Sequence, residues 1–229
     1  MFKSNLIHCA SKLEEKNILK LGKSLKTKVM PYGILNKLIK KKIEKKKINK
    51  KAIFFSRIHK KKGIENLINA WMKVNNSHWC LDIYGPVEDK KYLQQLKLSI
   101  KKNDNIRILN PIYDTNKKFK IFEKYDFMIL PTFSENFGFI ILESLARGLP
   151  VLTTKNTPWD DIKKKNLGWI SSNSKLSLIK ILKKIFYVSK KDNNYFYVKS
   201  KNAISYAHNF GWNLVSKQYV NVYKKLLNE

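Results

Sequence analysis

The sequence is poor in cysteine, and it has no long hydrophobic run. Its two cysteines, Cys9 and Cys80, are far apart and lack the spacing of metal ligands, so a reduced, cytoplasmic setting is expected. No stretch of the chain approaches the roughly 18 apolar residues that span a membrane. The opening residues MFKSNLIHCASKLEEK lack the apolar core and the cleavage site of a signal peptide. We therefore expect a cytoplasmic protein, free or at the inner face of the membrane.

Arginine and acidic residues are also scarce. Lysine and arginine together number 47 against 17 acidic residues, which gives a net charge of +30, but only Arg57, Arg107 and Arg147 are arginine. Proteins that read nucleic acid rely on arginine for bidentate contacts to phosphate and guanine, so we expect no nucleic-acid partner. The abundance of lysine, asparagine and isoleucine is typical of AT-rich codons. Peripheral contact between lysine clusters and an anionic membrane is the alternative interpretation.

Several familiar motifs are missing. The sequence contains neither a G-x-x-x-x-G-K-[ST] phosphate loop nor a G-x-G-x-x-G dinucleotide fingerprint. Its four histidines, His8, His59, His78 and His208, do not have the spacing of a metal-binding cluster. We therefore expect each histidine to be structural or exposed.

Hydrophobic residues make up 43% of the chain, which is enough to form a core. Between Ala52 and Ser172, short apolar stretches alternate with stretches of helical periodicity. This alternation predicts βαβ units and a parallel sheet, so the expected fold class is α/β with a Rossmann-like domain. Strands are expected at 52–56, 78–85, 106–109, 126–131, 150–154 and 168–172, and helices at 64–74, 89–101, 117–124, 139–147, 176–187, 195–208 and 212–227.

The pattern predicts four segments along the chain. Residues 1–34 are expected to form a strand–helix–strand unit that is too small to hold its own core. Residues 35–51 are rich in lysine and predict a solvated linker or an exposed helix. Residues 52–210 are expected to form the Rossmann-like domain, and residues 211–229 a C-terminal helix.

Within the first segment, strands are expected at 5–10 and 26–30. Ser11 is the expected N-cap of the intervening helix, because Glu14 follows it at the spacing of a capping box. The helix is expected to run to Leu21 and to stop at the following glycine.

The loop after the first strand of the predicted domain has two candidate site residues, Arg57 and Lys62. Ligands of parallel sheets bind beyond the carboxyl ends of the strands. A guanidinium and an ammonium group there could neutralise a diphosphate and the charge that develops on it as a leaving group. The alternative is that Lys60 to Lys62 are simply solvated. Arg57 stands out because arginine is so rare in this chain.

The second candidate constellation lies between Pro131 and Pro150, where an apolar strand leads through a loop into an apolar helix. The N-terminus of a helix binds anions, and Gly138 lets a ligand approach the backbone closely. Glu143 lies in this apolar helix and needs partners. Ribose hydroxyls would be suitable partners, and a nearby lysine is the alternative. The loop residues are Glu135, Asn136, Phe137 and Gly138.

A third candidate is the loop at 156–161, which follows the strand at 150–154. It could close over the site. The alternative is an ordinary turn capped by Thr157 or Asp160.

Taken together, these motifs resemble the retaining glycosyltransferases of the GT-B fold, in the group 1 (family 4) class. The stretch FFSRIHKKKGIENLINAW looks like the family's phosphate-binding strand–loop–helix, and SENFGFIILESLARGLPVL matches its E-x7-E signature. The TPW loop and the LGWI that follows are similar to a subset that includes lipopolysaccharide-core and capsule transferases. The resemblance covers about residues 50–229.

The resemblance implies transfer of a sugar from a nucleotide-sugar donor to a glycan or lipid-linked acceptor, with retention of configuration and without a metal or other cofactor. Glu135 would contact the donor sugar, and the backbone amides of Asn136, Phe137 and Gly138 would bind sugar or phosphate. Glu143 would hold the ribose. Arg57 and Lys62 would hold the diphosphate.

One departure from the family is large. In the family, a whole N-terminal Rossmann domain binds the acceptor, whereas residues 1–34 look like only its last strand, helix and hinge, with Tyr32 where the family often has asparagine. We therefore expect an incomplete enzyme, which either needs a separate N-terminal domain polypeptide or derives from a split or truncated reading frame. The alternatives are a non-catalytic remnant that binds nucleotide sugars, and a basic protein that binds a membrane or nucleic-acid surface.

Overall fold

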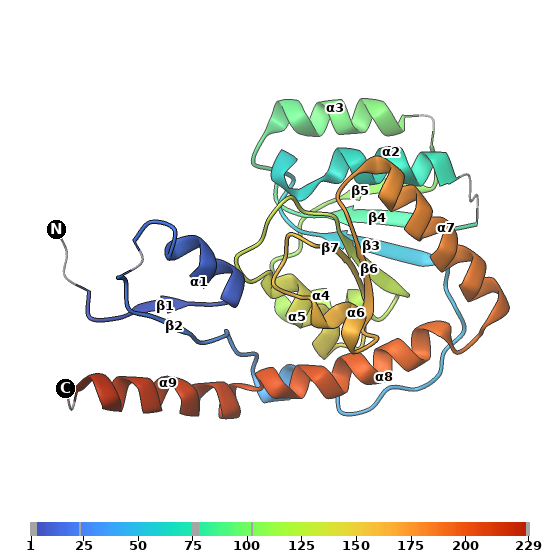
Figure 1. The fold of residues 1–229 in the computed structure, drawn as a ribbon. Helices are drawn as coiled ribbons and strands as arrows, with labels where there is room; N and C mark the ends of the chain where they lie inside the picture. The colour runs from blue at the N-terminus through green and yellow to red at the C-terminus, as the bar shows by residue number, and fades with distance from the viewer. Residues whose placement is uncertain (1–3, 23, 75–77, 102, 228–229) are drawn as a thin grey trace.

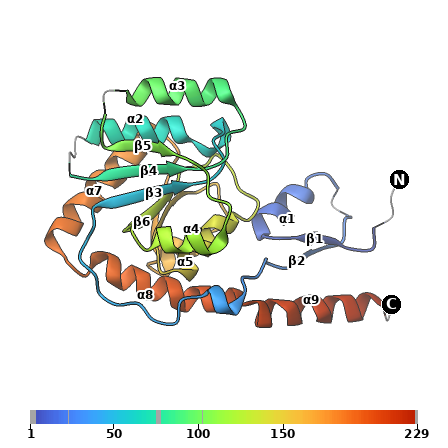
Figure 2. The ribbon, with the colours of Figure 1, turned by 180° about the vertical axis from the view of Figure 1, so that it is seen from behind.

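The computed structural model describes residues 4–22, 24–74, 78–101 and 103–227. A small N-terminal unit lies beside a larger α/β domain, and the C-terminal helix runs back along the small unit (Figure 1). Turning the molecule by 180° shows the same arrangement from behind (Figure 2). None of the described helices is both long and apolar enough to cross a bilayer.

Six parallel strands form the sheet of the larger domain, in the order β5-β4-β3-β6-β7-β8. The chain therefore starts in the middle of the sheet, builds outward to one edge, and crosses back to build the other half. This is the doubly wound Rossmann order, and it confirms the predicted fold class. The strands are β3 (Lys51–Phe55), β4 (Cys80–Tyr84), β5 (Ile106–Leu109), β6 (Phe127–Leu130), β7 (Val151–Thr154) and β8 (Gly168–Ser171).

Helices cover both faces of this sheet (Figures 1 and 2). On one face lie α2 (Ile64–Val74), α3 (Lys90–Ile100) and α7 (Lys175–Lys191); on the other lie α4 (Thr115–Phe122), α5 (Phe139–Ala146) and α8 (Tyr195–Ala207). Side-chain caps fix several starts, since Asp89, Asp114 and Ser174 each accept a hydrogen bond from a backbone N–H three residues on. The Asp114 cap is why α4 begins two residues before the predicted position.

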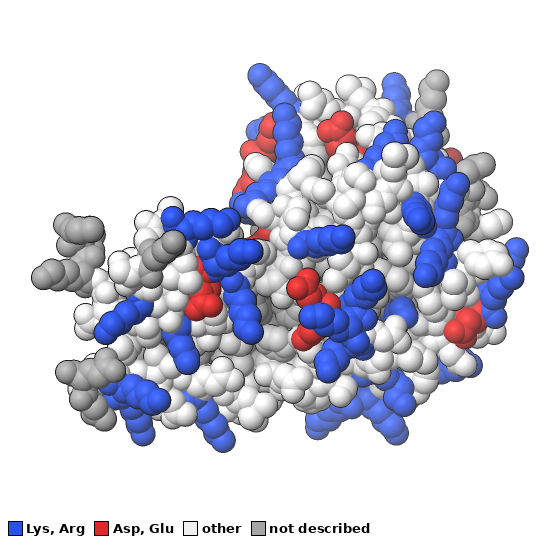
Figure 3. Space-filling model, in the orientation of Figure 1, with Lys and Arg blue, Asp and Glu red and all other residues white. Residues whose placement is uncertain are grey.

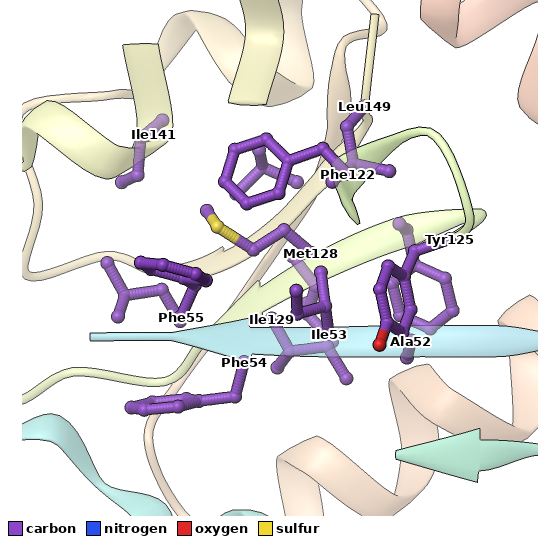
Figure 4. Close-up of a cluster of buried hydrophobic side chains, with 14 of the residues drawn as sticks. Ala52, Ile53, Phe54, Phe55, Phe122, Tyr125, Met128, Ile129, Ile141 and Leu149 are labelled. Carbon is purple, nitrogen blue, oxygen red and sulfur yellow. The ribbon is translucent and has the colours of Figure 1, made fainter. Parts of the chain in front are cut away.

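The core is continuous through the sheet because β3, β6 and β7 are buried on both faces. Neighbouring side chains of a strand point to opposite faces, so Phe54 packs below β3 while Phe55 packs above it (Figure 4). Phe55 meets Phe122 edge to face at a centroid distance of 5.6 Å. This contact fastens α4 to the centre of the sheet, next to the loops that form the candidate site.

The N-terminal unit consists of β1 (Ile7–Cys9), α1 (Lys12–Ile18) and β2 (Thr27–Val29), and its two strands pair in parallel. Ser11 caps α1 as predicted. The carboxylate of Glu14 accepts from the backbone N–H of Ala10, not from that of Ser11. The predicted extension of α1 to Leu21 is wrong, because the chain closes there with a tighter bond from the Leu21 N–H to the Ile18 carbonyl.

The lysine-rich segment is an extended linker and not a helix, apart from one 3-10 turn, η1 (Asn36–Leu38). The backbone N–H of Lys40 donates to the Ala146 carbonyl at 2.8 Å. The ammonium of Lys46 donates to the carbonyls of Glu123 and Tyr125, each at 2.8 Å. The linker is therefore tied to the domain, while most of its lysines, Lys46 among them, are exposed, as expected of a solvated linker.

The last helix, α9 (Trp212–Leu227), connects the two units. Its start is bridged to the hinge, where Ile34 pairs with Gly211 and the amide of Asn36 donates to Asn213 at 2.8 Å. Further along, the hydroxyl of Tyr219 lies 3.0 Å from the imidazole of His8 on β1. These contacts hold the N-terminal unit next to the edge where the strands of the larger sheet end.

Candidate active site

The loops that follow β3 and β6 lie side by side, because these two strands are neighbours in the sheet. The backbone N–H of Phe133 donates to the Lys61 carbonyl at 2.9 Å, and the Thr132 hydroxyl donates to the same carbonyl at 3.2 Å. Gly63 has a φ of 69°, and a Cβ at that position would lie 2.2 Å from the Pro131 carbonyl oxygen. A glycine is thus required for the two loops to approach this closely.

This approach brings together Lys62 and Glu135, two of the predicted site residues. Lys62 Nζ donates to Glu135 Oε1 at 2.5 Å, and the side chains are only 9% and 14% exposed. Lys60 and Lys61 in the same loop are exposed, as the alternative of solvated lysines predicted. That alternative is wrong for Lys62. An ion pair so withdrawn from water persists because each charge neutralises the other, and a bound anion could take the place of the carboxylate.

The structure places Arg57 at the rim of the site and not in this buried pair. Its side chain is 56% exposed, and its Nη1 donates to Glu88 Oε1 at 2.5 Å. Glu88 follows β4, and sequence reasoning missed it. Its position beyond the carboxyl end of the neighbouring strand was the signal that could have identified it. The loops are joined, since the N–H of Ile58 donates to the Pro86 carbonyl at 2.8 Å.

The helix α5 begins directly after the loop of Glu135 to Gly138. Gly138 has a φ of 77°, in the left-handed region that favours glycine, and no side chain caps the helix. An uncapped N-terminus presents backbone N–H groups and the positive end of the helix dipole. This end of α5 is thus suited to an anion beside the Lys62–Glu135 pair.

The loop at 156–161 packs against this same turn. The Glu135 N–H donates to the Asn156 carbonyl at 3.2 Å, and Trp159 Nε1 donates to the Phe137 carbonyl. Thr157 is a turn residue as one alternative predicted, because its hydroxyl donates to the Thr154 carbonyl at 3.0 Å. Asp160 precedes the short helix α6 (Asp161–Lys164), which was not predicted, and its side chain does not cap it. The loop therefore helps to hold Phe137 in place through the hydrogen bond from Trp159.

Glu143 lies further along α5, with its side chain 17% exposed. Lys118 Nζ, from α4, donates to Glu143 Oε1 at 2.5 Å, and the Lys118 side chain is 14% exposed. Lys118 is thus the lysine partner of Glu143 that was one of the two alternatives predicted from the sequence. The sequence did not single out Lys118 from the other lysines of its helix, because only the packing of α4 beside α5 identifies it.

The N-terminal unit contacts the site loop, and a cavity lies beside this contact. The Ser11 hydroxyl donates to the Asn136 carbonyl at 2.8 Å, and the Asn136 amide donates to Glu14 Oε1 at 3.1 Å. Between the two units is a cavity of about 390 Å³. Its lining includes Lys12, Phe137, Lys155, Trp159 and Tyr206. Figure 3 shows lysine and arginine side chains scattered across the visible face, among a few acidic side chains and broad areas of other residues.

Within the described ranges, no group of three or more His, Cys, Asp or Glu side chains is arranged as metal ligands would be. Three cations of the candidate site, Arg57, Lys62 and Lys118, are each paired with a carboxylate. That the reaction needs no metal stays a prediction.

Comparison with known proteins identifies the family. The family model described as glycosyl transferases group 1 matches residues 36–202. This chain belongs to the group 1 glycosyltransferases. The match spans the linker, the sheet and both carboxylates of the E-x7-E signature, and it confirms the family resemblance of the sequence.

Two curated relatives of this glycosyltransferase chain are informative about length. An uncharacterised glycosyltransferase of Methanocaldococcus jannaschii is 26% identical over 175 residues, which are 75% of this chain and 44% of that protein. The GtfA subunit of a UDP-N-acetylglucosamine–peptide N-acetylglucosaminyltransferase of Streptococcus agalactiae is 28% identical over 125 residues, which are 54% of this chain and 24% of that protein. The chain thus spans less than half the length of these relatives.

Solved structures show the same fold. Sucrose-phosphate synthase from Thermosynechococcus elongatus aligns with a TM-score of 0.83 and 17% identity, over 99% of this chain and 59% of that one. The HepE protein of Anabaena, solved with UDP and glucose, aligns with a TM-score of 0.79 and 18% identity, over 97% of this chain and 64% of that one. The glycosyltransferase chain therefore has the architecture of a GT-B domain.

Proposed function

We propose that this chain binds a nucleotide-sugar donor at the carboxyl end of its sheet and takes part in transfer of the sugar, with retention, to a glycan or lipid-linked acceptor. The observation that supports this most directly is the buried Lys62–Glu135 pair beside the uncapped start of α5. A cation, a helix N-terminus and a carboxylate in one place suit a ligand that has both phosphate and hydroxyl groups.

In this proposal, the donor exchanges partners with the ion pair. Lys62 releases Glu135 and binds the diphosphate, with Arg57 approaching from the rim. Glu135, once released, accepts hydrogen bonds from hydroxyls of the donor sugar. The backbone amides of Asn136, Phe137 and Gly138 face the phosphate or the sugar, and Glu143 holds the ribose. These groups come from the loop after β3, the loop after β6 and the helix α5, so closure of the site depends on the loop contacts described above.

The chemistry follows from this placement. The bond between the anomeric carbon and the diphosphate oxygen breaks, and negative charge develops on the leaving diphosphate. Lys62, Arg57 and the start of α5 stabilise that charge and so replace a metal ion in this role. The acceptor hydroxyl attacks from the same face, and its proton passes to the departing phosphate oxygen. The configuration at the anomeric carbon is therefore retained.

The acceptor side is proposed to come from a further domain. The curated relatives are longer than this chain, which spans 44% and 24% of them. We propose that an acceptor-binding domain contacts the unit of β1, α1 and β2 and supplies the acceptor site. The proposed setting is synthesis of cell-surface polysaccharide or lipopolysaccharide at the inner face of the membrane, since lysine side chains are spread over the visible surface (Figure 3) and lysine clusters attract anionic headgroups.

Donor binding is tested by calorimetry with UDP-glucose and GDP-mannose on the full chain and on Lys62→Ala. Loss of the charge-assisted contact to phosphate is expected to weaken binding about tenfold or more, because a hydrogen bond between charged groups contributes about 1.5–3 kcal/mol. Lys61→Ala is the matched control, since Lys61 is exposed in the same loop. Equal affinity of the Lys62→Ala and wild-type proteins would contradict the proposed diphosphate site.

The rival functions predict other results. A non-catalytic remnant binds the donor but transfers nothing, even after the domain that contacts the acceptor is added. A protein that binds through its +30 charge alone loses affinity steeply with salt and is indifferent to Glu135→Ala. Donor affinity that falls in Glu135→Ala at constant salt favours the glycosyltransferase donor site.

A further inference from the structure

The ion pair between Lys118 and Glu143 joins two helices of the larger domain. Lys118 Nζ donates to Glu143 Oε1 at 2.5 Å, and both side chains keep a small exposed fraction, 14% and 17%. The pair is therefore withdrawn from bulk water but still within reach of a ligand. Among the described residues, Lys118 is the one that hydrogen-bonds this carboxylate.

The position of Lys118 is not explained by the stability of its helix. Lys118 lies near the N-terminus of α4, which starts at Thr115. A cation at that end opposes the helix dipole, which favours acidic residues there. A partly buried ion pair also loses hydration that its attraction only partly restores. A contact to a ligand would give this placement a reason.

We propose that Lys118 is a ribose-binding residue of the donor site, an inference that rests on the proposed function of Glu143. A carboxylate accepts hydrogen bonds only, whereas an ammonium has three donors, of which the contact to Glu143 uses one. The two neighbouring hydroxyls of a ribose match such a pair. One hydroxyl donates to Glu143, while the oxygen of the other accepts from Lys118. The pair thus selects a ribonucleotide over its 2′-deoxy analogue.

The first measurement is the ratio of the dissociation constants for 2′-deoxy-UDP and UDP, obtained by calorimetry on the full chain. GDP and 2′-deoxy-GDP are measured in parallel. The wild-type ratio is expected to be about ten, which is the discrimination that one hydrogen bond to a charged group supplies. In Lys118→Met, the ratio is expected to fall to about two or less, with weaker binding of the ribonucleotide. Lys118→Gln serves as a second variant if Lys118→Met does not fold.

The control is Lys120→Met, on the same helix and exposed, which should keep the wild-type ratio. If Lys118 only joined α4 to α5, its substitution would change the melting temperature and leave the ratio of the two dissociation constants unchanged. An unchanged ratio in both Lys118 variants, or tighter binding of UDP, would overturn the proposal for Lys118 and leave the donor site intact. If the wild-type chain binds neither UDP nor GDP, the proposed donor site fails and this inference fails with it.

Discussion

The carboxylate of Asp82 is buried in the middle of the sheet, and its hydrogen bonds allow a quantitative stability test. Its side chain on β4 is 2% exposed and accepts from Arg107 Nε and Nη2 at 2.7 Å each and from the Tyr125 hydroxyl at 2.5 Å. Tyr125→Phe removes one donor and keeps the ring that packs in the core. The carboxylate then stays paired with Arg107, so the loss is one hydrogen bond to an ionised group, about 1.5–3 kcal/mol.

This loss is large enough to measure. For a chain of this size, about 2 kcal/mol lowers the melting temperature by about 4–8 °C. Urea unfolding monitored by circular dichroism gives the free energy of unfolding. The m-value, which is the slope of this free energy against urea concentration, should stay unchanged because the fold is kept. Tyr113→Phe is the control, since Tyr113 is 79% exposed and should change the free energy of unfolding by less than about 0.5 kcal/mol.

The same variant has a predicted pH dependence. Burial, followed by hydrogen bonds with Asp82 and Tyr84, raises the pKa of Tyr125. The pKa in the folded protein thus lies above that of the unfolded chain, about 10, so the stabilisation by Tyr125 is complete below pH 10 and is lost as the pH rises further. The difference in stability between wild type and Tyr125→Phe should be constant from about pH 7 to 9 and should shrink above pH 10.

Two outcomes would refute the predicted loss of stability, and a third would refute its predicted pH dependence. One is a Tyr125→Phe protein as stable as wild type, which would mean that the hydroxyl is not a significant partner of Asp82. The other is an equal loss in Tyr113→Phe, which would mean that removal of any tyrosine hydroxyl has this effect. A difference that grows above pH 10 would show that the shift in the pKa of Tyr125 has the opposite sign.

Two further predictions concern the loops and the linker. Gly63→Ala places a Cβ 2.2 Å from the Pro131 carbonyl oxygen, at a φ of 69°. Unfolding measurements should therefore show that the free energy of unfolding falls by more than about 2 kcal/mol. Gly22→Ala is the control, because its Cβ would lie no nearer than 3.4 Å to Leu25, and it should leave the free energy of unfolding nearly unchanged. Burial alone would raise the pKa of Glu123, but Arg147 and Lys40 outweigh it and lower that pKa, so Glu123→Gln should be less stable than wild type near pH 7. The stabilisation by Glu123 is lost as the pH falls through the lowered pKa, so the difference in stability between wild type and Glu123→Gln should become smaller below pH 4. Unfolding curves in which this difference became larger below pH 4 would contradict the prediction.

The fold could be predicted because its signals are local. The buried strands β3 and β6 are runs of apolar residues, and Asp89 and Ser174 mark helix starts by the side-chain oxygens that cap them. The short helix α6 escaped prediction, because its four residues are too few to show helical periodicity. The end of α1 was overestimated because its sequence continues with residues that a helix tolerates.

The pairings of the site could not be predicted in the same way. Lys62 and Glu135 are 73 residues apart, and only the strand order places them together. Lys118 is one of several lysines on its helix, and neither periodicity nor charge distinguishes it from Lys117 or Lys120. The partner of Arg57 depends on how a long side chain lies at an exposed rim. Such contacts follow from tertiary packing, which the local sequence does not encode.

The pairing of the cations restricts what the site can bind. The overall charge of +30 would attract any anion, but Lys62, Lys118 and Arg57 each already hold a carboxylate at 2.5 Å. A bare phosphate that took one of these cations would leave a carboxylate unpaired, and at the two buried pairs that penalty offsets much of the gain. A ligand with hydroxyls beside its phosphates satisfies both members of each pair. The same pairing, which neutralises these three cations when the site is empty, supports the proposed preference for a nucleotide sugar over free phosphate or a polyanion, although the surface as a whole is strongly basic.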